Sequence, residues 1–179
     1  MIGARPLGLR RRPLWVVAVL SLLSLGLYVP LWFGLSWLEL RQETRDERAQ
    51  PALHALSLLV PLYGYWQAYR HFSVIAGLQK GVGIARPVDA LSAALGVVVW
   101  SVTFLHYSTE PIFMIMDGVE LLAGTAVVVY GQRALNAYWR ARPGPPVDER
   151  VVDTDWLALA AAATFFALQL VGYLSGPTN

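Results

Sequence analysis

The chain has 179 residues, of which 56% are hydrophobic and 15% charged, whereas soluble domains usually carry about 25% charged residues. Its net charge of +2 lacks the strongly basic balance of a nucleic-acid-binding protein. Because there is no cysteine, disulfides, cysteine-ligated zinc, iron–sulfur clusters and a cysteine nucleophile are excluded. These numbers predict an all-α integral membrane bundle forming one membrane domain over residues 1–179.

The first apolar segment, residues 13–38, contains no charged side chain and follows three arginines at positions 10–12. A bilayer core about 30 Å thick is crossed by about 20 apolar helical residues, so this segment is long enough. It is too long and too aromatic for a signal-peptide core. Gly26, Pro30 and Gly34 interrupt it, which predicts either a kinked span or a re-entrant hairpin that turns between Gly26 and Pro30.

The second apolar segment, residues 52–69, is also uncharged and is broken by Pro61 and Gly64. The sequence LSLL occurs at 20–23 and again at 56–59, and a proline, a tyrosine and a tryptophan follow each copy. This pattern is explained either by an internal duplication or by coincidence in leucine-rich sequence.

Three polar stretches separate the apolar segments. Residues 39–51 mix arginines with carboxylates, and this mixed charge predicts a solvated loop or helix extension with local ion pairs. Residues 70–87 predict a basic loop that is helical up to Ile75. In residues 133–155 we expect a helix to leave the membrane and end before the PGPP stretch, and a new helix to follow with its N-cap at Asp153 or Thr154.

Three further segments, 88–108, 111–132 and 156–175, complete five candidate spans. Tryptophans and tyrosines gather near segment ends, as expected for side chains at the membrane–water interface. Segment 156–175 is rich in alanine, and small residues of this kind allow helices to pack closely in a bilayer.

The distribution of basic residues predicts the topology. With five alternating spans, eleven of the 14 lysines and arginines lie on the cytoplasmic side, and only the three in residues 39–51 lie outside. If segments 13–38 and 52–69 are both hairpins, those three lie inside as well. We favour five spans in a bacterial inner membrane, with the N-terminus cytoplasmic and the C-terminus outside.

Residues 24–28 read SLGLY and are followed by Trp32. This stretch resembles the T-L-G-I-Y-x-x-Y-W hallmark of a family of small bacterial multi-pass membrane proteins of unknown function. Serine replaces the threonine, and Leu31 stands in place of the second aromatic residue. Residues 134–139, ALNAYW, resemble an A-L-N-x-Y-W ending seen in longer members of that family. The resemblance implies membrane residence and no established activity.

Asp117 and Glu120 are the strongest candidates for a functional site, because spacing of three residues places both on one helix face. Ionised carboxylates inside a membrane are expensive and therefore face a protein interior with a partner or a proton. One interpretation is a proton or cation site that includes His106 and Tyr107 at the end of the preceding segment. The other is a wet vestibule or a partner-subunit contact.

The other histidines give little evidence of a cofactor. His54 and His106 would both lie near the outer leaflet in the five-span arrangement, where a pair of histidines can ligate haem, but histidines near helix ends are far more often interfacial. No catalytic zinc spacing is present. We therefore expect neither a cofactor nor a metal.

Three functions are consistent with these patterns. The first is a non-enzymatic accessory or scaffolding subunit that packs against a larger membrane complex or a further copy. The alternative is a small oligomeric transporter or channel component using Asp117 and Glu120, which the broken helices also fit. A lipid-modifying enzyme is the weakest reading, because no nucleophile–base pair is apparent.

Overall fold

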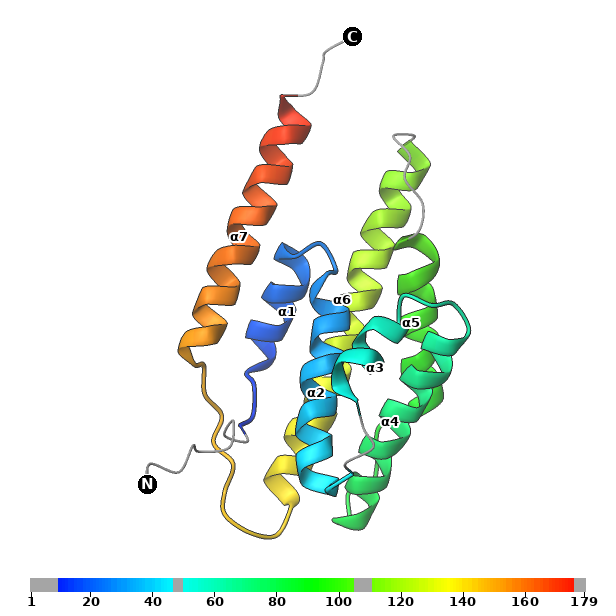
Figure 1. The fold of residues 1–179 in the computed structure, drawn as a ribbon, viewed down its shortest axis with the longest axis vertical. Coiled ribbons are helices and arrows are strands. Elements are labelled where there is room, and N and C mark those ends of the chain that lie inside the picture. Colours follow the sequence, from blue (N-terminus) through cyan, green and yellow to red (C-terminus); the bar gives the residue numbers. More distant parts are fainter. Residues whose placement is uncertain (1–9, 47–49, 105–110, 176–179) are drawn as a thin grey trace.

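A computed structural model describes residues 10–46, 50–104 and 111–175. Within these ranges every regular element is a helix, so the prediction of an all-α fold is confirmed. The helices are α1 (Leu14–Leu23), α2 (Tyr28–Thr44), α3 (Pro51–Ser57), α4 (Tyr63–Gly81), α5 (Ala90–Phe104), α6 (Pro111–Ala141) and α7 (Asp153–Leu174). They lie roughly parallel or antiparallel to one long axis (Figure 1).

The first apolar segment folds back on itself. α1 ends at Leu23, the chain reverses through Gly26 with a φ of +85°, and α2 returns alongside (Figure 1). The base of this hairpin is closed by an ion pair of 2.6 Å between Arg12 and Glu39, residues that a continuous helix would hold roughly 40 Å apart. Pro30 lies in the first turn of α2, where its missing N–H is tolerated. The preferred five-span topology is therefore wrong for this segment.

The second apolar segment also reverses. The ring of His54 in α3 and the guanidinium of Arg70 in α4 both contact Trp37, with centroid distances of 4.5 and 6.0 Å. Gly64 permits the tight crossing, because a Cβ there would lie 2.6 Å from the carbonyl oxygen of Ser57. Both segments therefore fold as helical hairpins, and neither hairpin tip reaches as far as the upper ends of α6 and α7 (Figure 1).

The remaining helices run up and down beside the hairpins. α4 continues to Gly81, well beyond the predicted end at Ile75, and α5 returns along it (Figure 1). α6 has 31 residues, or about 46 Å at 1.5 Å per residue, and its continuation past residue 132 confirms the helix predicted there. α7 begins at Asp153, so its N-cap is Val152, one residue before the predicted N-cap. The Asp155 carboxylate accepts the Val152 backbone N–H at 3.0 Å.

Large aromatic side chains pack against glycines of α6 to form the core. A Cβ on Gly124 would lie 2.6 Å from Trp100, and one on Gly131 would lie 2.3 Å from Trp32. The exposed fractions of Trp32, Trp100 and Trp139 are 0, 1 and 2%. The prediction of interfacial tryptophans is therefore wrong for these three, because the small residues facing them leave room for whole indole rings inside the bundle.

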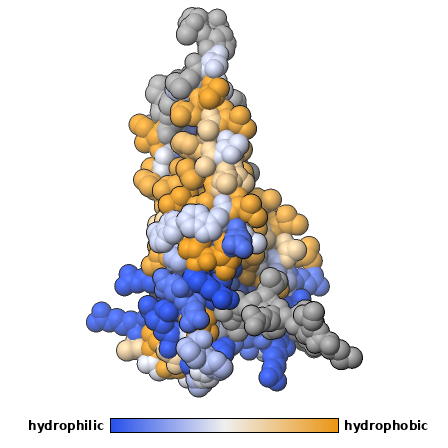
Figure 2. All heavy atoms as spheres, turned by 90° about the vertical axis from the view of Figure 1, so that its left-hand side faces the viewer, coloured by the Kyte–Doolittle hydropathy of each residue, from blue (hydrophilic) through white to orange (hydrophobic). Residues whose placement is uncertain are grey.

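The exposed tryptophans fit that prediction better. Trp15 and Trp156 lie side by side at the starts of α1 and α7, with ring centroids 6.1 Å apart, and each is at least half exposed. On the face that Figure 2 shows, hydrophilic residues cover the lower part of the molecule and hydrophobic residues the upper part. This face is thus polar at one end of the long axis and apolar at the other.

Among the described helices, only α7 is both long enough and apolar enough to cross a membrane, over Asp153–Tyr173. The stretches Leu14–Leu23 and Ala90–Ser101 are apolar but shorter. A buried core helix of a soluble protein can have the same length and composition, but α7 is exposed along most of its surface. The charged residues of α7 are confined to its first turn, and exposure of a long apolar helix on this scale is typical of contact with lipid or with another protein.

Candidate functional site

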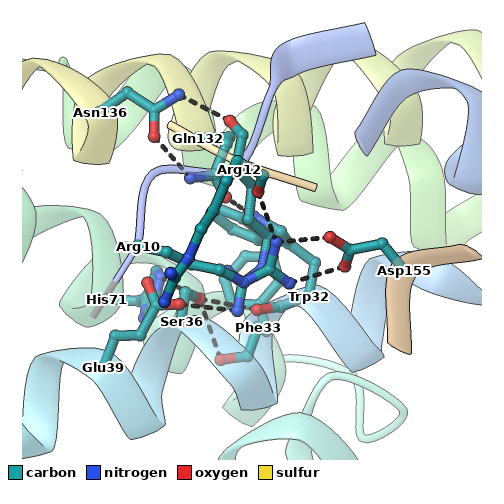
Figure 3. Close-up of polar contacts among 11 residues, drawn as sticks. Arg10, Arg12, Trp32, Phe33, Ser36, Glu39, His71, Gln132, Asn136 and Asp155 are labelled. Atoms are coloured by element: carbon teal, nitrogen blue, oxygen red, sulfur yellow. Dashed lines mark hydrogen bonds and ion pairs between the residues drawn. The ribbon is translucent and has the colours of Figure 1, made fainter. Parts of the chain in front are cut away.

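A chain of buried hydrogen bonds crosses the middle of the bundle (Figure 3). The indole N–H of Trp32 donates to Gln132 Oε1 at 2.9 Å, and Gln132 Nε2 donates to Asn136 Oδ1 at the same distance. Asn136 Nδ2 then donates to the backbone carbonyl of Arg12 at 2.8 Å. Gln132 and Asn136 lie one turn apart on the same face of α6, so this chain fixes α2 and the segment before α1 to α6.

Two ion pairs lie at the end of this chain. Arg12 and Glu39 meet through a single contact of 2.6 Å, and their side chains are 7% and 11% exposed. Within the described part of the protein, Arg12 Nε, Arg12 Nη1 and Glu39 Oε2 have no hydrogen-bond partner. Arg10 binds the Asp155 carboxylate through both terminal nitrogens and thereby joins the segment before α1 to the start of α7 (Figure 3).

Glu39 and Glu43, two of the acidic residues after the first apolar segment, pair with distant residues and not locally, contrary to the prediction. Glu39 pairs with Arg12 across the hairpin, and Glu43 accepts hydrogen bonds from Tyr138 and Arg142 of α6. These carboxylates extend along α2 on the side that faces the bundle, so they join distant elements and are not solvated loop charges.

His71 is fully buried beside the same network. Ser36 donates its hydroxyl to the Trp32 carbonyl at 2.8 Å, so His71 Nε2, 3.1 Å from that hydroxyl oxygen, carries the hydrogen and donates it. The rings of Phe33 and Trp37 lie 4.9 and 5.0 Å away. Burial lowers the pKa of His71, which lies beyond the apolar segment 52–69, to about 3. The imidazole is therefore neutral at physiological pH and acts as a polar contact between α2 and α4.

A groove of about 470 Å³ opens between α3 and α4. Arg70 lies over the Trp37 and Trp66 rings, 6.0 and 5.8 Å from their centroids, and is exposed. His54 and Gln67 line the groove, and His54 Nε2 and Gln67 Oε1 are buried without a partner in the described structure. An exposed cation and two residues that each hold a buried, unsatisfied polar atom thus line one groove.

The predicted carboxylates lie in different surroundings. Asp117 is exposed, whereas Glu120, one turn further along α6, is 7% exposed. The two therefore share a helix but differ strongly in burial. His106 and Tyr107 lie outside the described residues, so their proposed association with these carboxylates stays a prediction.

The haem ligand considered for His54 has a different environment in the structure. His54 Nδ1 lies 2.7 Å from the Gln50 carbonyl, and its ring packs on Trp37. Within the described residues, no three histidine, cysteine or carboxylate side chains gather as a metal site would require. The expectations of no cofactor and no metal otherwise stay predictions.

Sequence reasoning missed the buried face of α4, although its signal was present. The buried positions of this helix recur every three or four residues well past the predicted end; they are Gly64, Gln67, Ala68, His71, Phe72, Ile75, Ala76 and Gln79. This spacing is that of one helix face. It could have identified His71 as a core residue and not as part of a basic loop.

No family model, curated protein or solved structure matches this chain. The resemblance based on residues 24–28 and 134–139 therefore stays a prediction. The function must be argued from the geometry of the molecule itself.

Proposed function

We propose that this protein is a non-enzymatic integral membrane protein that serves as an accessory or scaffolding subunit of a larger membrane complex. The observation that carries the proposal is α7, an apolar helix with charged residues only in its first turn, which the rest of the chain leaves largely uncovered. The proposal places the protein in a bacterial inner membrane. The positive-inside rule favours a cytoplasmic position for its charged end.

Membrane residence is supported by the surface of α7. Every described residue from 166 to 173 is exposed, and the exposed fractions of Leu168, Val171 and Tyr173 are 67, 59 and 71%. Soluble monomers rarely expose apolar surface that is continuous on this scale. In a bilayer the same surface needs no cover. With α7 as a span, α5 and α6 are the next candidates, whereas the two hairpins enter the bilayer from the charged end and return to it.

A helical partner is supported by the small face of α7. Its first half packs on α1 through Ala158, Leu159 and Ala162. Ala160, Ala163 and Ala167 lie on a different face and are exposed. Small residues with this spacing let a second helix approach closely in a membrane, where packing drives association. We therefore expect a transmembrane helix of another subunit to lie along this face.

The test is purification of the full chain from its native membranes in mild detergent, using two matched variants. Ala163→Trp places bulk on the small face, whereas Leu168→Trp places the same bulk on another exposed face of α7. We expect a stoichiometric membrane partner with the wild type and Leu168→Trp, and its loss with Ala163→Trp. A monomer, a homo-oligomer, or equal behaviour of the two variants would contradict an accessory role mediated by this face.

A second candidate function is a small oligomeric ion pathway, which the burial of Glu120 favours. A carboxylate enclosed within a membrane helix bundle is a recurrent element of proton pathways. In proteoliposomes such a pathway would lose proton flux with Glu120→Gln. The exposed Asp117 provides the control, because Asp117→Asn should leave the flux intact. Absence of flux in the wild type would eliminate this candidate.

A further inference from the structure

The α3–α4 groove combines one cation with unsatisfied acceptors and an apolar wall. Arg70 has no ion pair or hydrogen bond within the described structure, and the faces of Trp37 and Trp66 hold its guanidinium in place. Stacking on aromatic rings orients an arginine but leaves its five N–H donors available. The groove therefore presents the positioned guanidinium of Arg70, whose free N–H donors and positive charge suit an anionic ligand.

The remaining polar atoms of the groove define what must accompany the anion. Since a carbonyl only accepts hydrogen bonds, the Gln50 carbonyl fixes the hydrogen of His54 on Nδ1. His54 Nε2 is then a bare acceptor in the neutral ring. Gln67 is 4% exposed, and while its Nε2 donates to the Tyr63 hydroxyl, its Oε1 is left without a donor. A matching ligand must supply donors as well as negative charge.

The apolar side of the groove indicates an amphiphile. Leu53, Leu56 and Val60 line it and are 59, 60 and 52% exposed. They follow one another along α3 and the turn after it, and the tip of the α3–α4 hairpin points the same way as the upper ends of α6 and α7 (Figure 1). An acyl chain laid along these three side chains would remove their apolar surface from water or from loose contact with bulk lipid.

From this arrangement we propose that the groove binds one phospholipid with an anionic, hydroxylated headgroup, of which phosphatidylglycerol is the simplest. Its phosphate meets Arg70, its hydroxyl groups donate to His54 Nε2 and Gln67 Oε1, and an acyl chain follows Leu53, Leu56 and Val60. Basic pockets on the cytoplasmic side of membrane proteins commonly bind such headgroups. The inference requires membrane residence but not the partner subunit, so it can be tested on the isolated chain.

The experiment is native mass spectrometry of the full chain in detergent, mixed with equimolar phosphatidylglycerol, phosphatidic acid and phosphatidylcholine. We expect preferential retention of one phosphatidylglycerol. Arg70→Gln should weaken its retention about five-fold, corresponding to about 1 kcal/mol for one cation at an anionic headgroup. Arg140→Gln is the matched control, because Arg140 is an exposed cation at the charged end, remote from the groove lining. Equal effects of the two variants would overturn the site.

A second variant tests the donors of the headgroup. His54→Phe keeps an aromatic ring against Trp37 but removes the Nε2 acceptor. We expect it to abolish the preference for phosphatidylglycerol over phosphatidic acid while anionic lipid is still retained above phosphatidylcholine. An unchanged preference would overturn the assignment of hydroxyl recognition to this histidine. Circular dichroism of each variant establishes that its helices are intact, and none of these outcomes depends on whether a partner co-purifies.

Discussion

The buried pair of Arg12 and Glu39 gives the sharpest test of the hairpin at the start of the chain. Glu39→Gln removes the negative charge and leaves the guanidinium of Arg12, 7% exposed, without its counter-charge. Breaking a buried pair from one side destabilises a protein by about 3–5 kcal/mol. The pair uses one contact, and three of its polar atoms have no described partner, so little additional hydrogen bonding would compensate the burial of the remaining charge.

Replacing both partners should have the opposite outcome. With Arg12→Met and Glu39→Leu together, no charge is left buried, and such replacements are often neutral or stabilising by about 1–4 kcal/mol. The Arg12 backbone carbonyl still accepts the Asn136 hydrogen bond in this variant. Glu149→Gln provides the surface control, because Glu149 pairs with Arg11 at 3.3 Å with its side chain 42% exposed. An exposed pair contributes about 0–1 kcal/mol.

The assay is unfolding in mixed micelles containing an increasing fraction of denaturing detergent. Fluorescence of Trp32 and Trp37, which lie in the same helix as Glu39, reports the loss of the hairpin. We expect a large shift in the midpoint for Glu39→Gln, little shift for Glu149→Gln, and recovery in the double variant. If Glu39→Gln shifts the midpoint no more than the surface control, the ion pair does not close the hairpin. If the double variant is as unstable as the single one, the buried-charge explanation is refuted.

Two further predictions concern α6. Gly131→Ala places a methyl group against the rigid, buried ring of Trp32 and should destabilise the protein by about 1–3 kcal/mol. Gly118 has open space around it, so Gly118→Ala should stabilise the helix by up to about 1 kcal/mol. The same detergent titration measures both variants, and equal effects would contradict the packing described. Burial and the hydrogen bond to Glu43 raise the pKa of Tyr138 to about 12. The tyrosine of the unfolded chain loses its proton near pH 10, so the free energy of unfolding should fall as pH rises from about 10 to 12. Tyr138→Phe should lack the share of this fall that Tyr138 causes. Identical pH profiles of the variant and the wild type would contradict the raised pKa of Tyr138.

The sequence was informative about where helices break and poor at showing what the breaks do. Gly26 and Pro61 lie in the two breaks, whereas Pro30, Gly34 and Gly64, which were also expected to interrupt the segments, lie inside α2 and α4. A glycine or proline indicates that a helix ends, but it leaves open whether the next helix continues or returns. The direction is determined by distant contacts, such as Arg12 with Glu39, which have no local signal. The five-span alternative failed for this reason.

The candidate groove was equally hard to predict. His54 lies in α3 and Arg70 in α4, so the connection between the two helices separates them in the sequence. In the fold both side chains contact Trp37. Their residue types carry no metal or catalytic spacing that a pattern could detect. Asp117 and Glu120 attracted attention because i, i+3 spacing is local, but the packing of α6 separates an exposed carboxylate from a buried one. Local spacing thus identified a pair whose members do not share an environment.

The packing of the two hairpins bears on the internal duplication that the repeated LSLL pattern raised. Tyr28 and Tyr63 are the first residues of α2 and α4, and Ser36 and His71 follow them at equal distances along their helices. These two equivalent positions touch each other, with Ser36 Oγ 3.1 Å from His71 Nε2. Two related units that pack about a local two-fold axis bring equivalent positions together at that axis. The same relation would also pack α1 on α4 as α2 packs on α3, whereas in the described structure α1 packs mainly on α6 and α7. The contact between Ser36 and His71 is therefore not accompanied by the rest of a two-fold arrangement, and the internal duplication stays a prediction.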